Sequence, residues 1–328
     1  VIIIDEAHER TVNTDVLIGL LSQVIKLRRK KFENGEMNVE PLKLIIMSAT
    51  LRVDDFLNNQ RLFEVKPPLI EIKARQFKVD VHFSQNTPSE GKRMESVKKC
   101  VELIHERMPP GGILVFLPGK NEINECVAYF KNYGQSASKK KFDPKPIKSN
   151  NKPTKAEVTP STEDSKTEQN KNDNNETTIN DDTDIFKDEI EEIVNPPDNL
   201  DIVDKQPMIC LPLYSMLPQE EQDKAFQIYP DDVRVVVFST NIAETSVTIP
   251  NIRYVVDLGL EKSRNFDFNR GVTTTKVDFI SKASAKQREG RAGRTGPGYC
   301  FRLYSSGFFS NFAQFTEPEI KARIYLCD

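Results

Sequence analysis

A length of 328 residues allows roughly two domains of ordinary size, and a hydrophobic content of 38% with a formal charge of −3 indicates a globular protein. No apolar stretch approaches the roughly 20 residues of a membrane-spanning helix, so no membrane partner is expected. The five cysteines are widely spaced without a C-x-x-C pair, which argues against a zinc or dithiol site and favours a reducing compartment.

The chain begins with VIIIDEAHER, in which an apolar strand at residues 1–4 runs directly into Asp5 and Glu6. Ligands of parallel sheets sit beyond the carboxyl ends of strands, so these two carboxylates are predicted at a ligand-facing edge. One acid there can hold Mg²⁺ while the next deprotonates an attacking water, as phosphoryl transfer requires. Taken alone, an acid pair is more often a chance strand end or a helix cap.

A zinc site is a rival interpretation of the same stretch. HERTV begins like the zinc motif H-E-x-x-H, but Val12 stands where the second histidine is needed. The other histidines, His82 and His105, do not lie at a helical ligand spacing from His8. Hydrolysis by that kind of metal site is therefore excluded.

A long amphipathic helix is predicted at residues 13–31, and its basic tail suits the negative end of the helix dipole. Its apolar stripe consists of Leu17, Leu20, Leu21, Val24 and Leu27. The next apolar strand, residues 42–47, ends at the sequence SAT, where Ser48 and Thr50 carry hydroxyls able to hydrogen-bond His8. Alone, this short motif is a weak signal.

Short apolar runs alternate with amphipathic helices along the chain, which indicates an α/β fold with parallel sheets covered on both faces. The further predicted strands are residues 111–117, 208–214, 233–239 and 252–258. Two prolines and an extended run within residues 65–83 indicate a crossing between two lobes. We expect the lobes at residues 1–72 and at residues 73–135 with 207–310, followed by a further region at 311–328.

Residues 136–206 differ from the rest of the chain. They hold 17 Asp and Glu against 11 Lys, a net charge of −6, and few aromatic or branched apolar residues. Such a segment cannot bury enough surface to offset its ordering entropy, so a disordered acidic insertion is predicted. Within it, residues 184–194 space apolar side chains loosely on one helical face. A transient helix is favoured there over a partner-binding motif.

Two motifs of the second lobe carry the strongest chemical signals. FSTNIAETSVTIP is dense in small polar side chains, which suit the phosphates of a nucleic acid or a nucleotide ribose, although such a loop is usually only a turn. Its polar residues are Ser239, Thr240, Asn241, Thr245, Ser246 and Thr248.

The second motif, QREGRAGR, supplies Gln287, Arg288, Arg291 and Arg294, with Gly290 and Gly293 permitting close approach. Arg291 and Arg294 lie three residues apart, so on a helix they share a face and can reach one triphosphate. The alternative is an RNA-binding basic patch without catalysis.

Taken in this order, the motifs DEAH, SAT, TNIAETS and QREGRAGR resemble those of the DEAH-box RNA helicases, over nearly all of the chain except the insertion. The resemblance implies two RecA-like lobes that clamp ATP, with Asp5 and Glu6 binding Mg²⁺ and activating water. It also implies that His8, Ser48 and Thr50 couple hydrolysis to strand movement.

The same resemblance assigns residues of the second lobe. The side chains expected at the γ-phosphate and the attacking water are Gln287, Arg291 and Arg294, with Thr248 also at the nucleotide. The side chains expected to face the RNA backbone are Thr240, Asn241 and Thr245. FNRGVTTTKVDFI predicts a β-hairpin turning at residues 269–271, able to act as a strand-separating wedge, and residues 311–328 resemble the start of a winged-helix region.

A narrower resemblance rests on MSATLRVDDF, ARQFKVDVHF, SVTIPNIRYVVD and FRLYSSGFF. These phrases are similar to those of the nucleolar DEAH helicases of small ribosomal subunit assembly. That likeness implies pre-rRNA or small nucleolar RNA as partner, an activating protein partner, and a nuclear, nucleolar location.

Some positions depart from the family pattern. Pro118 and Lys120 stand where Thr and Gln are usual, Pro250 where an Asp is common, and Glu289 where a small residue is usual; none of these changes removes a catalytic group. No G-x-x-x-x-G-K-[ST] sequence occurs in the 328 residues, so we expect the phosphate-binding loop upstream of Val1 and expect the chain alone to be inactive. The alternative is a catalytically inactive product that binds RNA or a protein partner.

Overall fold

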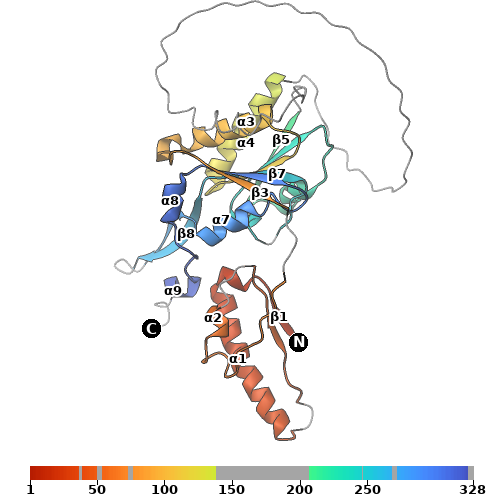
Figure 1. The fold of residues 1–328 in the computed structure, drawn as a ribbon, viewed down its shortest axis with the longest axis vertical. Coiled ribbons are helices and arrows are strands. Elements are labelled where there is room, and N and C mark those ends of the chain that lie inside the picture. Colours follow the sequence, from red (N-terminus) through yellow and green to blue (C-terminus); the bar gives the residue numbers. More distant parts are fainter. Residues whose placement is uncertain are drawn as a thin grey trace, which may run out of the picture.

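The computed structural model describes residues 1–36, 39–49, 54–72, 77–137, 207–245, 247–267 and 272–323, and Figure 1 shows their arrangement. These residues form a two-stranded parallel sheet near the N-terminus, a six-stranded parallel sheet and an antiparallel hairpin. We refer to the first sheet with its helices as the N-terminal unit and to the second as the six-stranded unit. The predicted α/β fold class with parallel sheets is confirmed.

The N-terminal unit holds the chain segment that carries the two acids. Strand β1 (Ile2–Ile4) pairs in parallel with β2 (Leu44–Ile46), as predicted. The short helices η1 (Ala7–Glu9) and α2 (Asp54–Leu57) complete the unit with α1 (Val12–Glu33). Helix α1 begins after Thr11, whose side chain accepts a hydrogen bond from the Thr14 amide at 3.2 Å.

The predicted apolar stripe of α1 is only partly a core face. Leu21 is buried, together with Ile18, which the stripe did not include. The other members are exposed by 41% or more of their surface: Leu17, Leu20, Val24 and Leu27. The prediction of the helix was correct and that of its buried face was wrong, because two strands of three residues cover only the side of α1 that carries Ile18 and Leu21.

The six-stranded sheet has the order β3-β10-β7-β4-β6-β5, and every neighbouring pair is parallel. The strands in this order are β3 (Val79–Phe83), β10 (Gly298–Arg302), β7 (Ile252–Asp257), β4 (Gly112–Phe116), β6 (Arg234–Ser239) and β5 (Met208–Leu213). Four of these strands coincide with predicted strands, namely β7, β4, β6 and β5. β3 lies within the extended run of residues 65–83, and β10 was not predicted because GYCFR is short and lacks a clear apolar run.

Alternate side chains of this sheet enter two separate cores, as expected for strands covered on both faces. On one side, Ile113 and Val115 pack with α3 (Arg93–Arg107) and α4 (Lys120–Ala137). On the other, Leu114 and Phe116 pack with loops after β6 and after α7 (Lys282–Glu289). Figure 1 shows α3 and α4 above the sheet and α7 below it, on the side of the N-terminal unit.

The remaining elements are short. They are η2 (Glu90–Lys92), α6 (Gln219–Asp223), η3 (Lys224–Phe226), η4 (Asn241–Ala243), β8 (Leu260–Asp267), β9 (Val272–Phe279), α8 (Ser306–Ser310) and α9 (Glu319–Arg323). β8 and β9 form the predicted antiparallel hairpin, with Leu260 opposite Phe279 and Asp267 opposite Val272. Its turn at 269–271 lies outside the described residues, as do the predicted insertion from 138 on and the helix at 184–194. Among the helices described, none is long and apolar enough to cross a membrane.

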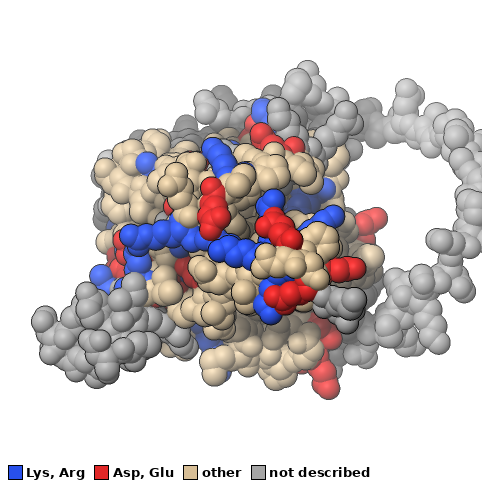
Figure 2. All heavy atoms as spheres, turned by 90° about the horizontal axis from the view of Figure 1, so that it is seen from below, with Lys and Arg blue, Asp and Glu red and all other residues tan. Residues whose placement is uncertain are grey.

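The C-terminal segment, residues 311–323, contacts the N-terminal unit. The Glu319 amide donates to the Arg10 carbonyl at 3.0 Å, and the Glu319 carboxylate accepts from the Val12 amide at 3.2 Å. An acid at the first turn of α1 also meets the positive end of the helix dipole. Figure 2, viewed from below, shows acidic and basic side chains mixed over this end of the molecule, so this face is not a uniformly basic surface.

We predict that Phe301→Ala lowers the free energy of unfolding of the 328-residue chain by about 3 to 5 kcal/mol, because Phe301 is fully buried in the six-stranded unit. Ile228, which is 78% exposed, provides the control: Ile228→Ala should change the same quantity by less than about 0.5 kcal/mol. Denaturant unfolding measures both. Equal losses from the two variants would contradict the assignment of the core.

Candidate functional site

The two acids lie directly beyond the carboxyl end of β1. Asp5 is exposed, and its Oδ1 accepts a hydrogen bond from the Glu6 amide at 2.8 Å. Glu6 has a φ of 53°, a left-handed conformation that is uncommon for a residue other than glycine. Strained backbone of this kind concentrates at functional sites, where the surrounding structure holds it.

We refer to residues 5–9, which follow β1, as the DEAH turn. His8 connects this turn to the end of β2. Its Nδ1 lies 3.2 Å from the Ala49 amide, which can only donate, so Nδ1 accepts and the ring proton lies on Nε2. The 3.4 Å contact of Nδ1 with Glu6 is therefore not an ion pair. The His8 side chain is 5% exposed, and Nε2 has no hydrogen-bond partner among the described residues. His8 thus contacts the SAT sequence through the backbone of Ala49, the residue after Ser48, and Thr50 lies outside the described residues.

The loop after β6 brings the two units into contact. Ser239 ends β6, Thr240 directly precedes η4, which begins at Asn241, and Thr245 follows the end of η4. The Thr245 hydroxyl donates to Glu9 Oε1 at 2.7 Å, across the boundary between the units. Thr245 thus contacts the DEAH turn directly in this structure, an interaction that its expected role at RNA did not anticipate.

The QREGRAGR motif is only partly helical. Helix α7 ends at Glu289, so Arg291 and Arg294 lie in the turns beyond it, and the expectation that they share a helical face was wrong. Gly290 stands at the C-terminus of α7, and glycine is a poor helix former. Gly293 does permit a close approach, but to the protein itself: a Cβ there would lie 2.7 Å from the Phe77 carbonyl oxygen.

Both arginines nevertheless converge, because each returns to the loop after β6. Arg291 donates through Nη1 to the Val247 carbonyl at 2.9 Å and through Nη2 to the Glu244 carbonyl. Arg294 donates through Nη1 to the Thr248 hydroxyl. The loop contacts, rather than a helix, hold these guanidinium groups together.

The charges of the two units face each other. Burial and the positive charge of Arg294 together lower the pKa of Arg291 to about 10, against the opposing negative charges of Glu244 and Glu6. Burial also lowers the pKa of Arg294, again opposed by Glu6. A pKa of about 10 leaves Arg291 cationic at neutral pH. Glu6 and the two arginines therefore form an acid and a cationic pair on facing units, an arrangement suited to a polyphosphate.

A pocket of about 470 Å³ lies beside them, between the DEAH turn, the loop after β6 and α7. It brings together four predicted site residues: His8, Asn241, Thr245 and Gln287. It also exposes Glu9 and Glu261, which the sequence reasoning did not select. Glu9 lies inside the quoted DEAHER stretch, but nothing in its spacing distinguished it from a solvated acid.

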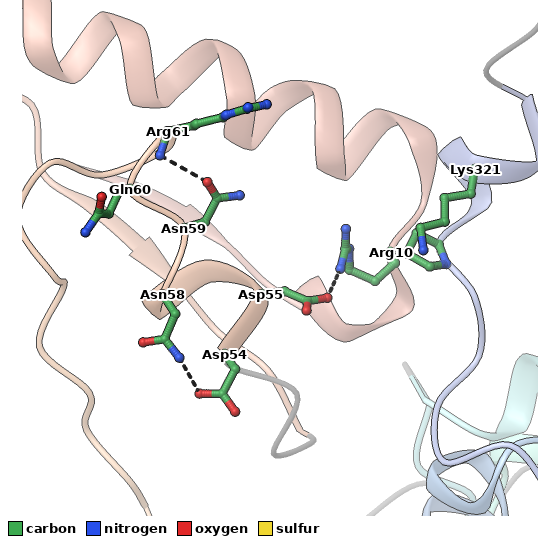
Figure 3. Close-up of a pocket in the computed structure, with 9 residues that line it drawn as sticks. Arg10, Asp54, Asp55, Asn58, Asn59, Gln60, Arg61 and Lys321 are labelled. Atoms are coloured by element: carbon green, nitrogen blue, oxygen red, sulfur yellow. Dashed lines mark hydrogen bonds and ion pairs between the residues drawn. The ribbon is translucent and has the colours of Figure 1, made fainter.

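A second pocket, of about 650 Å³, lies between α2 and the C-terminal segment (Figure 3). Arg10 is paired there with Asp15 at 2.8 Å and with Asp55. Figure 3 shows Lys321 of the C-terminal segment beside Arg10. Pro318 and Lys321 line this pocket together with residues of the N-terminal unit, so the pocket lies at a junction between the two segments.

Comparison with known proteins agrees with this fold. The sequence model of the helicase conserved C-terminal domain matches residues 170–296. A putative ATP-dependent RNA helicase of Schizosaccharomyces pombe is 44% identical over 97% of this chain and 25% of its own length. The human probable ATP-dependent RNA helicase DHX37 is 42% identical over 98% of this chain and 29% of its own length.

Among solved structures, the crystal structure of the Escherichia coli DEAH/RHA helicase HrpB matches with a TM-score of 0.59 and 26% identity, over 97% of this chain and 30% of that one. The fold and the motifs thus define a helicase core. More narrowly, the chain is similar to the DEAH-box (DEAH/RHA) helicases. It spans roughly a quarter to a third of the length of the curated relatives it matches.

We predict a pH-dependent effect of Glu261→Gln on stability. Burial, together with the negative charges of Glu244, Asp257 and Asp278, raises the pKa of Glu261 to about 7 against the opposing charge of Arg288. The folded chain thus keeps this proton above the unfolded pKa of about 4.3, so the contribution of Glu261 to stability falls as pH rises from about 4.3 to about 7. Glu261→Gln should therefore raise the melting temperature more at pH 8 than at pH 5.

The exposed Glu220, on α6, provides the control for this measurement, because Glu220→Gln removes an acid from the surface of the same unit. Thermal unfolding of both variants at the two pH values separates the cases. A gain that is the same at both pH values, or a loss at pH 8, would contradict the account of Glu261.

Proposed function

We propose that the gene product is an ATP-dependent RNA helicase that couples ATP hydrolysis to the remodelling of RNA or RNA–protein complexes. The observation that carries the proposal is the loop after β6, which bonds Arg291 and Arg294 and also bonds the DEAH turn through Thr245. The charge of Glu6 acts on both arginines across the two units. The proposal assigns residues 1–72 to a first RecA-like lobe, 73–135 and 207–310 to a second, 136–206 to an acidic insertion and 311–328 to the start of a winged-helix region.

ATP is the substrate in this proposal, and the two arginines contact its γ-phosphate. Their planar, forked donors match phosphate oxygens and stabilise the charge that develops in the transition state. Glu6 deprotonates the attacking water, and Gln287, at the wall of the neighbouring pocket, orients that water. Thr248 contributes at the nucleotide through the hydroxyl that already accepts from Arg294.

Asp5 and Glu6 would hold a magnesium ion. Among the described residues no group of three or more His, Cys, Asp or Glu could hold a metal ion, but Mg²⁺ needs only one or two carboxylates beside phosphate oxygens and water. Asp5 is exposed and uses only Oδ1 in the bond from the Glu6 amide described above, so the donor set fits. When bound, the ion supplies neutralisation of phosphate charge.

Coupling between hydrolysis and RNA runs through the contacts between loops. His8 and the SAT sequence move together because the Ala49 amide bonds His8, with Ser48 and Thr50 on either side. Thr245 bonds Glu9 across the units, so a relative movement of the units changes this contact. In the proposal Thr240, Asn241 and Thr245 then bind the RNA backbone with neutral donors.

A narrower proposal places the gene product in ribosomal RNA processing and small-subunit assembly, in the nucleolus, with pre-rRNA or small nucleolar RNA and an activating protein as partners. The support is the set of four sequence phrases resembling that subfamily. The second candidate function is a catalytically inactive module that binds RNA or a partner.

We predict that Arg294→Lys in the full-length gene product lowers RNA-stimulated ATP turnover by at least about 10²-fold, because lysine cannot reproduce the forked geometry of an arginine finger. RNA affinity should change little, since the charge is retained. Arg29→Lys, on a side chain that is 70% exposed, is the control and should leave turnover intact. If Arg294→Lys keeps most of the turnover, or if RNA binding falls in step with it, the basic-patch interpretation is favoured instead.

A further inference from the structure

Arg288 is the largest fully buried side chain that the structure describes, with 1% of its surface exposed. Its Nε donates to Glu244 Oε2 at 3.0 Å, and its Nη1 donates to Asp257 Oδ1 at 2.8 Å. The guanidinium also lies over the Phe116 ring, 4.9 Å from the ring centre. The charges of Asp257 and Glu244 overcome the effect of burial, which alone would lower the pKa of Arg288, and raise it above its ordinary value.

The two carboxylates of this cluster have different attachments. Asp257, at the end of β7, also accepts from the Gly259 amide at 2.9 Å and from the Tyr304 hydroxyl at 3.0 Å. Asp257 alone could neutralise Arg288 and is fixed by the fold. Glu244 is 6% exposed and adds a second negative charge to one buried cation. Burying an excess charge is unfavourable, so stability does not explain the presence of Glu244.

Glu244 is the first residue of the loop that carries the contacts of the site. Its own carbonyl and that of Val247 accept from Arg291, and the Thr248 hydroxyl accepts from Arg294. Its neighbour Thr245 donates to Glu9 of the N-terminal unit. Every described residue from 244 to 248 thus contacts one arginine of the site or the DEAH turn, and the Glu244 side chain is the only one among them that is anchored in the buried cluster of Arg288.

We propose that the Arg288–Glu244 pair positions both arginines of the site, by fixing the loop at residues 244–248 that orients their guanidinium groups. The inference rests on the proposed function, because it assigns a role to this pair in the hydrolysis of ATP. Arg288 and Glu244 are positioning residues: neither one needs to touch the nucleotide.

The first test is Glu244→Gln in the full-length gene product. Glutamine keeps the size of the side chain and can still accept from Arg288 through its amide oxygen, but the charge that tightens the bond is lost. We expect RNA-stimulated kcat to fall by at least about 10-fold, since small displacements of catalytic groups cost up to about 10²-fold. The KM for ATP should change by less than the kcat does, because the inference concerns groups used in the transition state.

The matched control is Tyr304→Phe, which removes a buried hydrogen bond to the same cluster without touching the loop at 244–248. Its melting temperature should fall at least as much as that of Glu244→Gln, with kcat retained within about twofold. If Tyr304→Phe lowers kcat as much as Glu244→Gln does, the pair only supports the fold, and the inference is wrong.

A double-mutant cycle gives the second readout. In a background that carries both Arg291→Lys and Arg294→Lys, measured under single-turnover conditions, Glu244→Gln should cause less than about a twofold further loss, because both groups that the pair positions are already replaced. If the fold-losses in turnover of the separate variants multiply instead, the inference is wrong. Failure of the proposed function gives a different result. In that case the wild type shows no ATP turnover, or Arg291→Lys keeps the wild-type turnover, and the inference is then wrong as well. A loss on Arg291→Lys without one on Glu244→Gln overturns the inference alone.

Discussion

The site depends on one buried cation. Arg288 bonds Asp257 at the end of β7 and Glu244 in the loop after β6, so it ties a strand of the central sheet to the segment that the arginines bind. Asp257 is held in place because it is the last residue of β7, and the loop after β6 is positioned by the bond of Glu244 to Arg288. Without that anchor, a loop of small polar residues has many conformations of similar energy, and the guanidinium groups bonded to its carbonyls would follow it.

A second consequence concerns how the two units communicate. The same loop that holds Arg291 also reaches Glu9 through Thr245, so the acid side of the site and the arginine side share one connection. The C-terminal segment adds another link, where Glu319 bonds the backbone at Arg10 and Val12. A change in the distance between the units therefore acts on the arginines and on the start of α1 together.

Much of the fold could be predicted from the sequence, because central parallel strands such as 111–117 and 233–239 are continuous apolar runs. The edge strand β3 and its neighbour β10 were harder, since VDVHF and GYCFR mix polar with apolar residues. The apolar stripe of α1 was over-interpreted, because periodicity shows which residues share a face but not whether a partner covers it. For the site, the motifs selected the candidate chemical groups. The bonds of Arg291 and Arg294 to a loop more than 40 positions away could not be read from spacing along the chain.

The central claim is that Arg291 and Arg294 act on the γ-phosphate from positions set by the Arg288–Glu244 pair. The most direct measurement is a structure of the full-length gene product with ADP and aluminium fluoride, a mimic of the transferring phosphoryl group. The account predicts that both guanidinium groups donate to the fluoride while Arg288 stays bonded to Glu244 and Asp257. A structure in which the two arginines remain away from the fluoride, or in which the Arg288–Glu244 bond is absent while they contact it, would contradict the account.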